Sequence, residues 1–172
     1  MKTVSQNIVE LLLANSMKVS FAESCTGGMI TSAITQVSGS SAVLDMSIVT
    51  YSNESKVKYT HVTDEILEAH GAVSEATALH MATGIRERSG ADIGVGITGI
   101  AGPTGGSEAK PVGTVFIAVV SGKANKVERF LFTGERETVR QQATQKALEV
   151  LYDFSLQQTS FYKKSRSYPR ET

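Results

Sequence analysis

The side chains best suited to chemistry lie in one short segment, FAESCTGG, from Phe21 to Gly28. Ser24 stands where an alternating apolar segment gives way to a helical pattern. Amides at the start of a helix lack partners within it and carry the positive end of its dipole, so they can stabilise an oxyanion or bind a phosphate. The segment is interpreted either as a nucleophile on a strand-to-helix turn or as a plain helix cap. On the first interpretation, the oxyanion or phosphate loop comprises Cys25, Thr26, Gly27 and Gly28.

A serine nucleophile needs a base, and the histidines at 61, 70 and 80 have no distinctive context for that role. Tyr51 and Lys56 flank Ser52, a plausible helix cap, at positions that meet in the hydrophobic-staple geometry. A lysine acting as a base must be neutral, so its pKa must fall from roughly 10.4 toward 7–8. The alternative is that the tyrosine packs and the lysine is solvated. Cys25 is more typical of a small buried residue than of a nucleophile.

Two glycine-rich stretches have different interpretations. GVGITG, from Gly94 to Gly99, matches the spacing of a dinucleotide fingerprint, but its glycines lie inside an apolar strand and no helix follows. We therefore expect a strand whose small residues let a helix pack closely. The stretch from Thr98 to Gly113 holds five glycines and two prolines between two strands. A loop of this length in a compact domain is typical of a site rim or of a mobile segment.

Composition indicates one water-soluble domain. The chain has 172 residues, 41% of them hydrophobic, with 17 basic and 17 acidic side chains. This balance gives no sign of a nucleic-acid partner. A single cysteine excludes an internal disulfide and does not by itself form a structural zinc site. We find no signal peptide or membrane span, and we expect a cytoplasmic homo-oligomer that needs no cofactor or metal.

The pattern of elements predicts a three-layer α/β/α sandwich with a mixed, mostly parallel sheet. We expect helices at 4–12, 29–37, 52–58, 74–89 and 139–154, and strands at 19–24, 48–51, 93–97, 113–120 and 127–132. Ser5 is a plausible cap for the first helix, and the last two strands are expected to be antiparallel. The domain is expected to span residues 1–157, followed by a disordered basic tail at 158–172.

Six blocks in order make the chain resemble the CinA C-terminal-domain family, the nicotinamide-nucleotide amidohydrolases. The blocks are AESCTGG, GSSA, VTYSN with its following lysine, HGAVSE, GIAGPTGGSEAKPVGTV and VRQQAT. The resemblance covers roughly residues 5–154. It implies a domain that stands alone, because the larger N-terminal half of long CinA proteins is absent, and conversion of nicotinamide mononucleotide to nicotinic acid mononucleotide and ammonia.

By this resemblance, Ser24 would be the nucleophile, Lys56 its general base and Tyr51 a group that assists the pair. The oxyanion would form near the amides of residues 25–27, and the small-molecule substrate would be a nucleotide. The expected substrate-binding residues are Ser41, Gly102, Gly105, Gly106 and Arg140, the last as a phosphate partner. A solvated helix residue is the alternative for the arginine.

Several positions depart from the family pattern. Met46 and Ser47 replace an arginine-glycine pair, Ser55 replaces an alanine, and Thr98 stands where serine is common. Residues 59–61 replace a more apolar segment. The alternative function is therefore a catalytically inactive or retuned paralogue that binds a nucleotide or acts as a scaffold.

Overall fold

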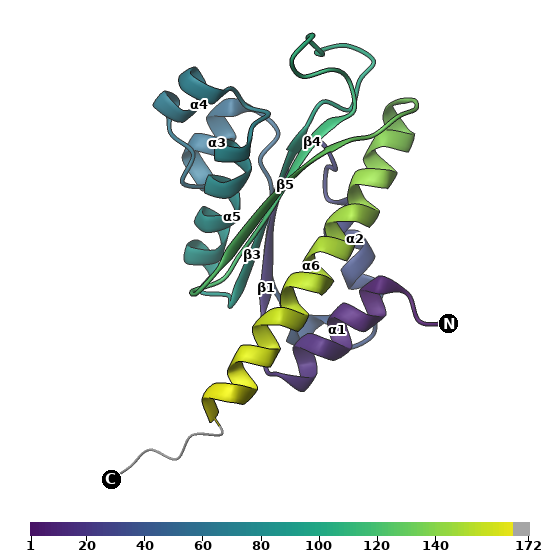
Figure 1. The fold of residues 1–172 in the computed structure, drawn as a ribbon, viewed down its shortest axis with the longest axis vertical. Coiled ribbons are helices and arrows are strands. Elements are labelled where there is room, and N and C mark those ends of the chain that lie inside the picture. Colours follow the sequence, from purple (N-terminus) through teal and green to yellow (C-terminus); the bar gives the residue numbers. More distant parts are fainter. Residues whose placement is uncertain (167–172) are drawn as a thin grey trace.

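Five strands form one mixed sheet in a computed structural model that describes residues 1–166 (Figure 1). The strand order is β2-β1-β3-β4-β5, with β1 paired in parallel to both β2 and β3, and β4 antiparallel to both of its neighbours. Four of the five strands therefore point the same way, as predicted. The strands are β1 (Val19–Glu23), β2 (Leu44–Val49), β3 (Ile93–Gly99), β4 (Thr114–Val120) and β5 (Asn125–Leu131).

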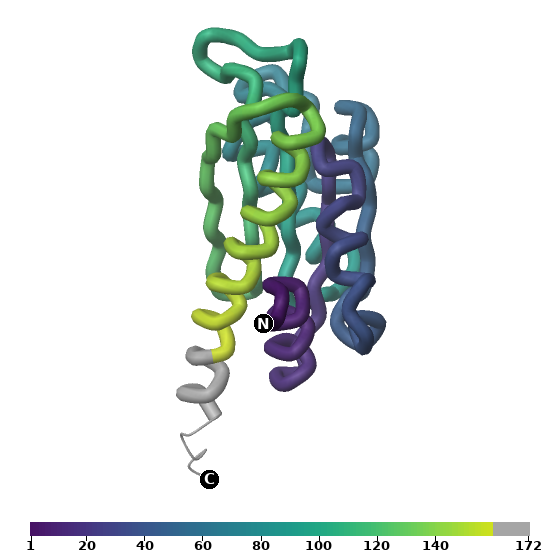
Figure 2. The backbone as a smooth tube through the Cα atoms, turned by 90° about the vertical axis from the view of Figure 1, so that its right-hand side faces the viewer, coloured from purple at the N-terminus to yellow at the C-terminus, as the bar shows by residue number. Residues whose placement is uncertain are grey.

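Helices cover both faces of the sheet and confirm the predicted three-layer fold. Along one face lie α1 (Val4–Ala14), α2 (Met29–Thr35) and α6 (Arg136–Arg166), which Figure 2 shows side by side. The other face carries α5 (Glu75–Ser89), with α3 (Asn53–Tyr59) and α4 (Asp64–His70) packed against it (Figure 1). A short 3-10 turn, η1 (Ser40–Ala42), leads into β2.

The glycines of GVGITG serve close packing, as the sequence indicated. An added Cβ at Gly94 would lie 2.2 Å from the carbonyl oxygen of Ala82 in α5, and one at Gly96 would lie 2.3 Å from that of Ala78. Those distances are far below van der Waals contact, so only glycine lets α5 approach β3 this closely. The motif is a strand from Ile93 to Gly99 that opens no helix.

Several element boundaries differ from the sequence expectations, and the helix α4 was not expected. Thr3, not Ser5, caps α1, because its hydroxyl accepts from the Gln6 amide in a capping box. The second strand begins at residue 44 rather than 48; it is half-buried at a sheet edge, so polar residues interrupt its apolar pattern. The last helix runs past residue 157, because Gln158 is buried and accepts a hydrogen bond from Ser121. Residues 167–172 of the expected tail lie outside the described residues.

The parallel arrangement brings several chain segments to one edge of the sheet. The carboxyl ends of β1, β2 and β3 share this edge, because these strands pair in parallel. The loop at 100–113 rises above it, and α6 begins beside that loop (Figure 1). Ligands of such sheets bind outside the carboxyl ends of the strands. Among the described residues, none of the helices combines the length and apolar character that a membrane crossing requires.

Candidate active site

Ser24 and Lys56 meet at the carboxyl edge of the sheet. Ser24 directly follows β1, whose last residue pairs with the last residue of β2, so the chain leaving β2 passes beside the serine. Ser52 then caps α3 by accepting a hydrogen bond from the Ser55 amide. Lysine at the fourth helical position points back over the helix start. Its Nζ therefore lies 3.0 Å from the Ser24 hydroxyl oxygen.

Burial changes the chemistry of Lys56. Only 2% of the residue is exposed, and its Nζ also donates to the backbone carbonyls of Thr50, at 2.7 Å, and Tyr51, at 3.3 Å. Removal from water disfavours the charged form and lowers the pKa of Lys56 to about 8. No carboxylate contributes to this shift. A large part of the population is therefore neutral at a mildly alkaline pH, as a general base requires.

A cavity of about 270 Å³ opens onto this pair. Its lining includes six of the residues expected from the sequence: Ser24, Cys25, Tyr51, Lys56, Gly102 and Gly105. Thr98 and Ala72 also line it, and the hydroxyl of Thr98 donates to the Ala72 carbonyl. The rim predicted for the glycine-rich loop is thus part of the cavity wall. A site with a serine, a buried amine and backbone groups suits attack on a carbonyl carbon.

The loop after Ser24 offers fewer free amides than the sequence suggested. The Gly27 amide donates to the Ser24 carbonyl, and the Gly28 amide donates to the carboxylate of Glu23. Within the described part of the chain, the amides of Cys25 and Thr26 donate to no other residue, and the Cys25 amide meets only its own sulfur. Both glycines have positive φ, of 61° and 96°, which explains their place in the turn.

The thiol of Cys25 is unsuited to attack. It is 5% exposed, and burial raises its pKa to about 12. Because a thiolate is the reactive form, this cysteine is inert at neutral pH. The structure thus agrees with the interpretation of Cys25 as a small buried residue, here beside Ser24.

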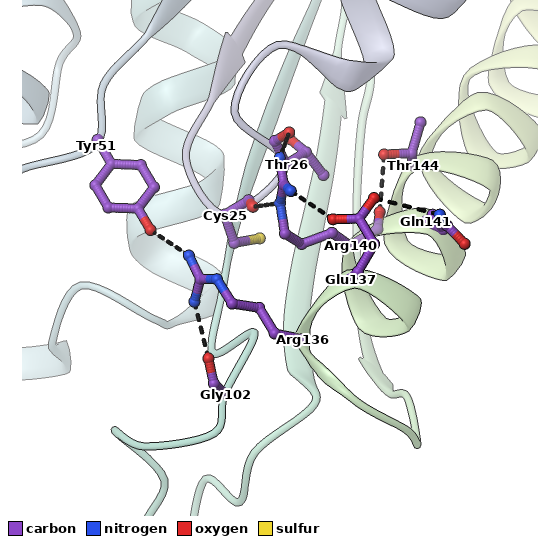
Figure 3. A network of polar contacts seen from close by, with 9 residues as sticks. All are labelled: Cys25, Thr26, Tyr51, Gly102, Arg136, Glu137, Arg140, Gln141 and Thr144. Atoms are coloured by element: carbon purple, nitrogen blue, oxygen red, sulfur yellow. Dashed lines mark hydrogen bonds and ion pairs between the residues drawn. The ribbon is translucent and has the colours of Figure 1, made fainter.

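Tyr51 lies at the site, but its hydroxyl is engaged elsewhere. The residue is 59% exposed, and its hydroxyl accepts a hydrogen bond from Arg136 at 2.7 Å (Figure 3). The same guanidinium donates to the Gly102 carbonyl at 2.8 Å. Only the backbone carbonyl of Tyr51 contacts the lysine. The assisting role expected for the phenol stays a prediction.

Arg140 forms hydrogen bonds with the loop and does not line the cavity. It donates to the carbonyls of Cys25 and Thr26, each at 3.1 Å, and to the carboxylate of Glu137 at 2.7 Å (Figure 3). All its hydrogen bonds are therefore internal to the protein. Its role as a phosphate partner stays a prediction that would require it to exchange these contacts.

Two other expected binding residues lie apart from the cavity wall. Ser41 is in η1, which precedes the amino end of β2, whereas Ser24 follows the carboxyl end of β1. The two serines are therefore at opposite ends of the sheet. Gly106 belongs to the loop but does not line the cavity; a Cβ there would meet the Val112 amide nitrogen at 2.7 Å.

Sequence reasoning missed Glu23 and Arg136. Glu23 is fully buried. Glutamate is almost never fully buried, so the local sequence pattern did not predict this position. Arg136 lines both the cavity at Ser24 and a second cavity of about 810 Å³, and Ala101 and Gly102 also line both. Its position one helical turn before Arg140 was the available signal, because residues four apart lie on one helix face.

Comparisons with known proteins agree on one family. The family model described as "CinA C-terminal domain" matches residues 1–155. The chain is 45% identical to the nicotinamide-nucleotide amidohydrolase PncC of Escherichia coli K12, over 91% of this chain and 95% of that protein. It is 47% identical to a CinA-like protein of Syntrophobacter fumaroxidans, over 83% of this chain. The chain spans about a third of the length of that longer relative, 34%.

Solved structures support the same fold. A competence/damage inducible protein CihA from Agrobacterium tumefaciens superposes with a TM-score of 0.84 at 41% identity, covering 86% of this chain and 91% of that one. A CinA superfamily protein from Klebsiella pneumoniae gives a TM-score of 0.86 at 36% identity, covering 90% of this chain and 96% of that one. The three-layer architecture is therefore shared with these proteins.

Proposed function

The chain belongs to the CinA C-terminal domain family, and on that premise we propose that it is an amidohydrolase of nicotinamide mononucleotide. The products are nicotinic acid mononucleotide and ammonia. One observation carries the proposal: a serine hydroxyl lies 3.0 Å from a buried lysine amine at the wall of a cavity. The name of the 45% identical relative supplies the substrate class.

The neutral form of Lys56 fits the role of base. A neutral amine has two N–H donors and one lone pair, whereas the ammonium has three donors. The two donors can stay on the carbonyls of Thr50 and Tyr51 while the lone pair accepts the Ser24 proton. The contacts that hold the lysine therefore aim its acceptor at the nucleophile. A base placed in this way contributes about 10²–10⁴-fold to the rate.

The reaction follows from that proton transfer. The Ser24 oxygen attacks the carboxamide carbon as its proton passes to Lys56. The negative oxygen that forms is stabilised by the amide of Cys25, which lines the cavity, and a donor of this kind is worth roughly 3–4 kcal/mol. Return of the proton to the amide nitrogen expels ammonia and leaves an acyl-serine. Water then attacks this ester with the same lysine as base, releasing the acid and restoring the hydroxyl.

Arg136 is the better-placed cation for the substrate phosphate. It lines the cavity, it is exposed, and its partners, the Gly102 carbonyl and the Tyr51 hydroxyl, are both neutral. A phosphate competes well for such a guanidinium, because ionised partners make stronger hydrogen bonds. Binding energy from the phosphate then helps to position the carboxamide against Ser24.

Ammonia release from nicotinamide mononucleotide by the purified chain tests the proposal. We expect turnover that is unaffected by chelators. If the mononucleotide raises the melting temperature but no ammonia appears, the chain is the binding-only paralogue, and the amidohydrolase assignment is wrong. Most positions that depart from the family pattern lie outside the cavity lining; Thr98 lines it.

A further inference from the structure

The carboxylate of Glu23 accepts several hydrogen bonds from the loop and the helix start that follow it. Glu23 is fully buried and immediately precedes Ser24. Its Oε2 accepts from the Thr26 hydroxyl at 2.7 Å, the Gly28 amide at 2.9 Å and the Ile30 amide at 3.3 Å. Its Oε1 accepts from the amide and hydroxyl of Thr31, at 2.9 and 2.7 Å. Five donors thus converge on one side chain that only accepts.

These bonds fix both ends of the turn that presents Ser24. Thr26 lies within the turn, and Gly28 ends it at the start of α2. Without the carboxylate, the first amides of α2 would be buried without partners, which is costly. The amide of Cys25, proposed above as an oxyanion donor, lies in the chain between Glu23 and Thr26, whose hydroxyl donates to the Glu23 carboxylate. Charge-assisted bonds of this kind are stronger than neutral ones.

The backbone of Glu23 reaches the other member of the reactive pair. Its carbonyl accepts from the Thr50 amide at 2.8 Å, and the Thr50 carbonyl in turn accepts from Lys56 Nζ at 2.7 Å. One residue therefore links the segment that carries the nucleophile to the segment that holds the base. No cavity-lining atom belongs to it, so it cannot contact the substrate.

We propose that Glu23 is a positioning residue whose buried carboxylate holds the Ser24–Gly28 loop in its reactive geometry. Its catalytic consequence rests on the proposed function, whereas its hold on the loop does not. Neither the family comparison nor the sequence motif assigns this role. Replacement by glutamine is a sharp perturbation, because each carboxylate oxygen meets at least two donors and an amide nitrogen cannot accept from them.

Labelling of the Cys25 thiol measures opening of the loop and does not require enzymatic activity. Cys25 is the chain's only cysteine, it lies inside the loop, and it is 5% exposed. Its labelling by Ellman's reagent therefore follows opening of this loop. For Glu23→Gln, we expect the thiol to be labelled at least about 10-fold faster than in the parent protein, because an exposed thiol ionises more readily. Both proteins are compared at a temperature at which their thermal unfolding curves show them to be folded. The exposed Glu68→Gln is the matched control and should label at the parent rate.

Thr31→Val is a milder second variant, which keeps the carboxylate but removes the hydroxyl that donates to Oε1 and also contacts the Ser47 hydroxyl. It should increase labelling by about threefold, and it decides the matter if Glu23→Gln does not fold. If Glu23→Gln folds and its thiol is labelled at the parent rate, the proposal is wrong. If Glu23→Gln does not fold, labelling of Thr31→Val at the parent rate has the same meaning.

Turnover gives a separate readout. In the folded Glu23→Gln protein, kcat should fall by about 10²-fold while KM for nicotinamide mononucleotide changes by less than about threefold. A merely structural role would leave kcat of the folded fraction unchanged. If the parent protein releases no ammonia, the proposed function fails, but the labelling experiment still decides the role of Glu23.

Discussion

The Nζ atom of Lys56 lies 3.0 Å from the hydroxyl oxygen of Ser24, although the two residues are 32 positions apart in the chain. The contact depends on parallel pairing of β1 with β2, which brings the ends of both strands to one edge. It also depends on the cap at Ser52, which starts α3 at that edge. A buried amine next to a hydroxyl, with backbone carbonyls as its other partners, is an arrangement that favours proton transfer from the serine.

The first prediction concerns the attacking atom. Ser24→Ala should lower turnover of nicotinamide mononucleotide by roughly 10³-fold or more, because the nucleophile is removed. Cys25→Ala should keep turnover within about threefold, because burial keeps that thiol protonated. Both rates are measured as ammonia release, with circular dichroism to verify folding. Loss of activity in the cysteine variant alone would refute the assignment of the serine.

The second prediction concerns pH. A base works only when deprotonated, and the pKa of Lys56 is lowered to about 8 by burial. Below that pH, kcat/KM should therefore rise about tenfold per pH unit, and above it the profile should level off. Lys56→Met should cost at least about 10²-fold and remove this inflection. Lys58→Met, an exposed lysine in the same helix, is the control and should keep the parent profile. A pH-independent parent enzyme would contradict the role of the lysine.

Local patterns predicted the fold well where burial and periodicity agree. The strand β4 and the helix α5 both lie within one residue of where the sequence placed them. The edge strand β2 was harder, because half of such a strand meets solvent and its polar residues hide the period.

The sequence predicted which chain segments form the site, but it did not predict the individual hydrogen bonds within it. The pairing of Ser24 with Lys56 was expected from the family resemblance, whereas helix-cap spacing alone placed Lys56 only near Tyr51. The different contacts of Arg136 and Arg140 could not be predicted, because both residues lie on one helix and only the docking of that helix decides which guanidinium meets the carbonyls of Cys25 and Thr26. Likewise, the full burial of Glu23 depends on tertiary contacts with α2.

A third prediction tests the close approach of α5 to β3. Gly96→Ala should lower the free energy of unfolding by about 3 kcal/mol, because its Cβ would lie 2.3 Å from the Ala78 carbonyl oxygen and backbone cannot move aside cheaply. Gly122→Ala is the matched control. Its Cβ would lie 3.1 Å from the flexible end of Arg86, so the change should stay within about 0.5 kcal/mol. Urea denaturation measures both. Equal stability of the two variants would contradict the packing.

The last prediction separates the two arginines of α6. The parent enzyme should prefer nicotinamide mononucleotide over free nicotinamide by at least about 10²-fold in kcat/KM, near 2.7 kcal/mol, because only the nucleotide has a phosphate. Arg136→Ala should narrow this preference at least about tenfold by weakening the nucleotide alone, because this side chain lines the cavity.

Arg140→Ala should instead lower kcat/KM for both substrates by a similar factor, because its bonds to the Cys25 and Thr26 carbonyls hold the loop that both reactions use. Each variant is assayed with each substrate, so the other arginine serves as its control. If Arg140→Ala narrows the preference and Arg136→Ala does not, Arg140 is the phosphate partner. It would then have to leave the loop carbonyls when the substrate binds, since its hydrogen bonds in the free protein are all internal.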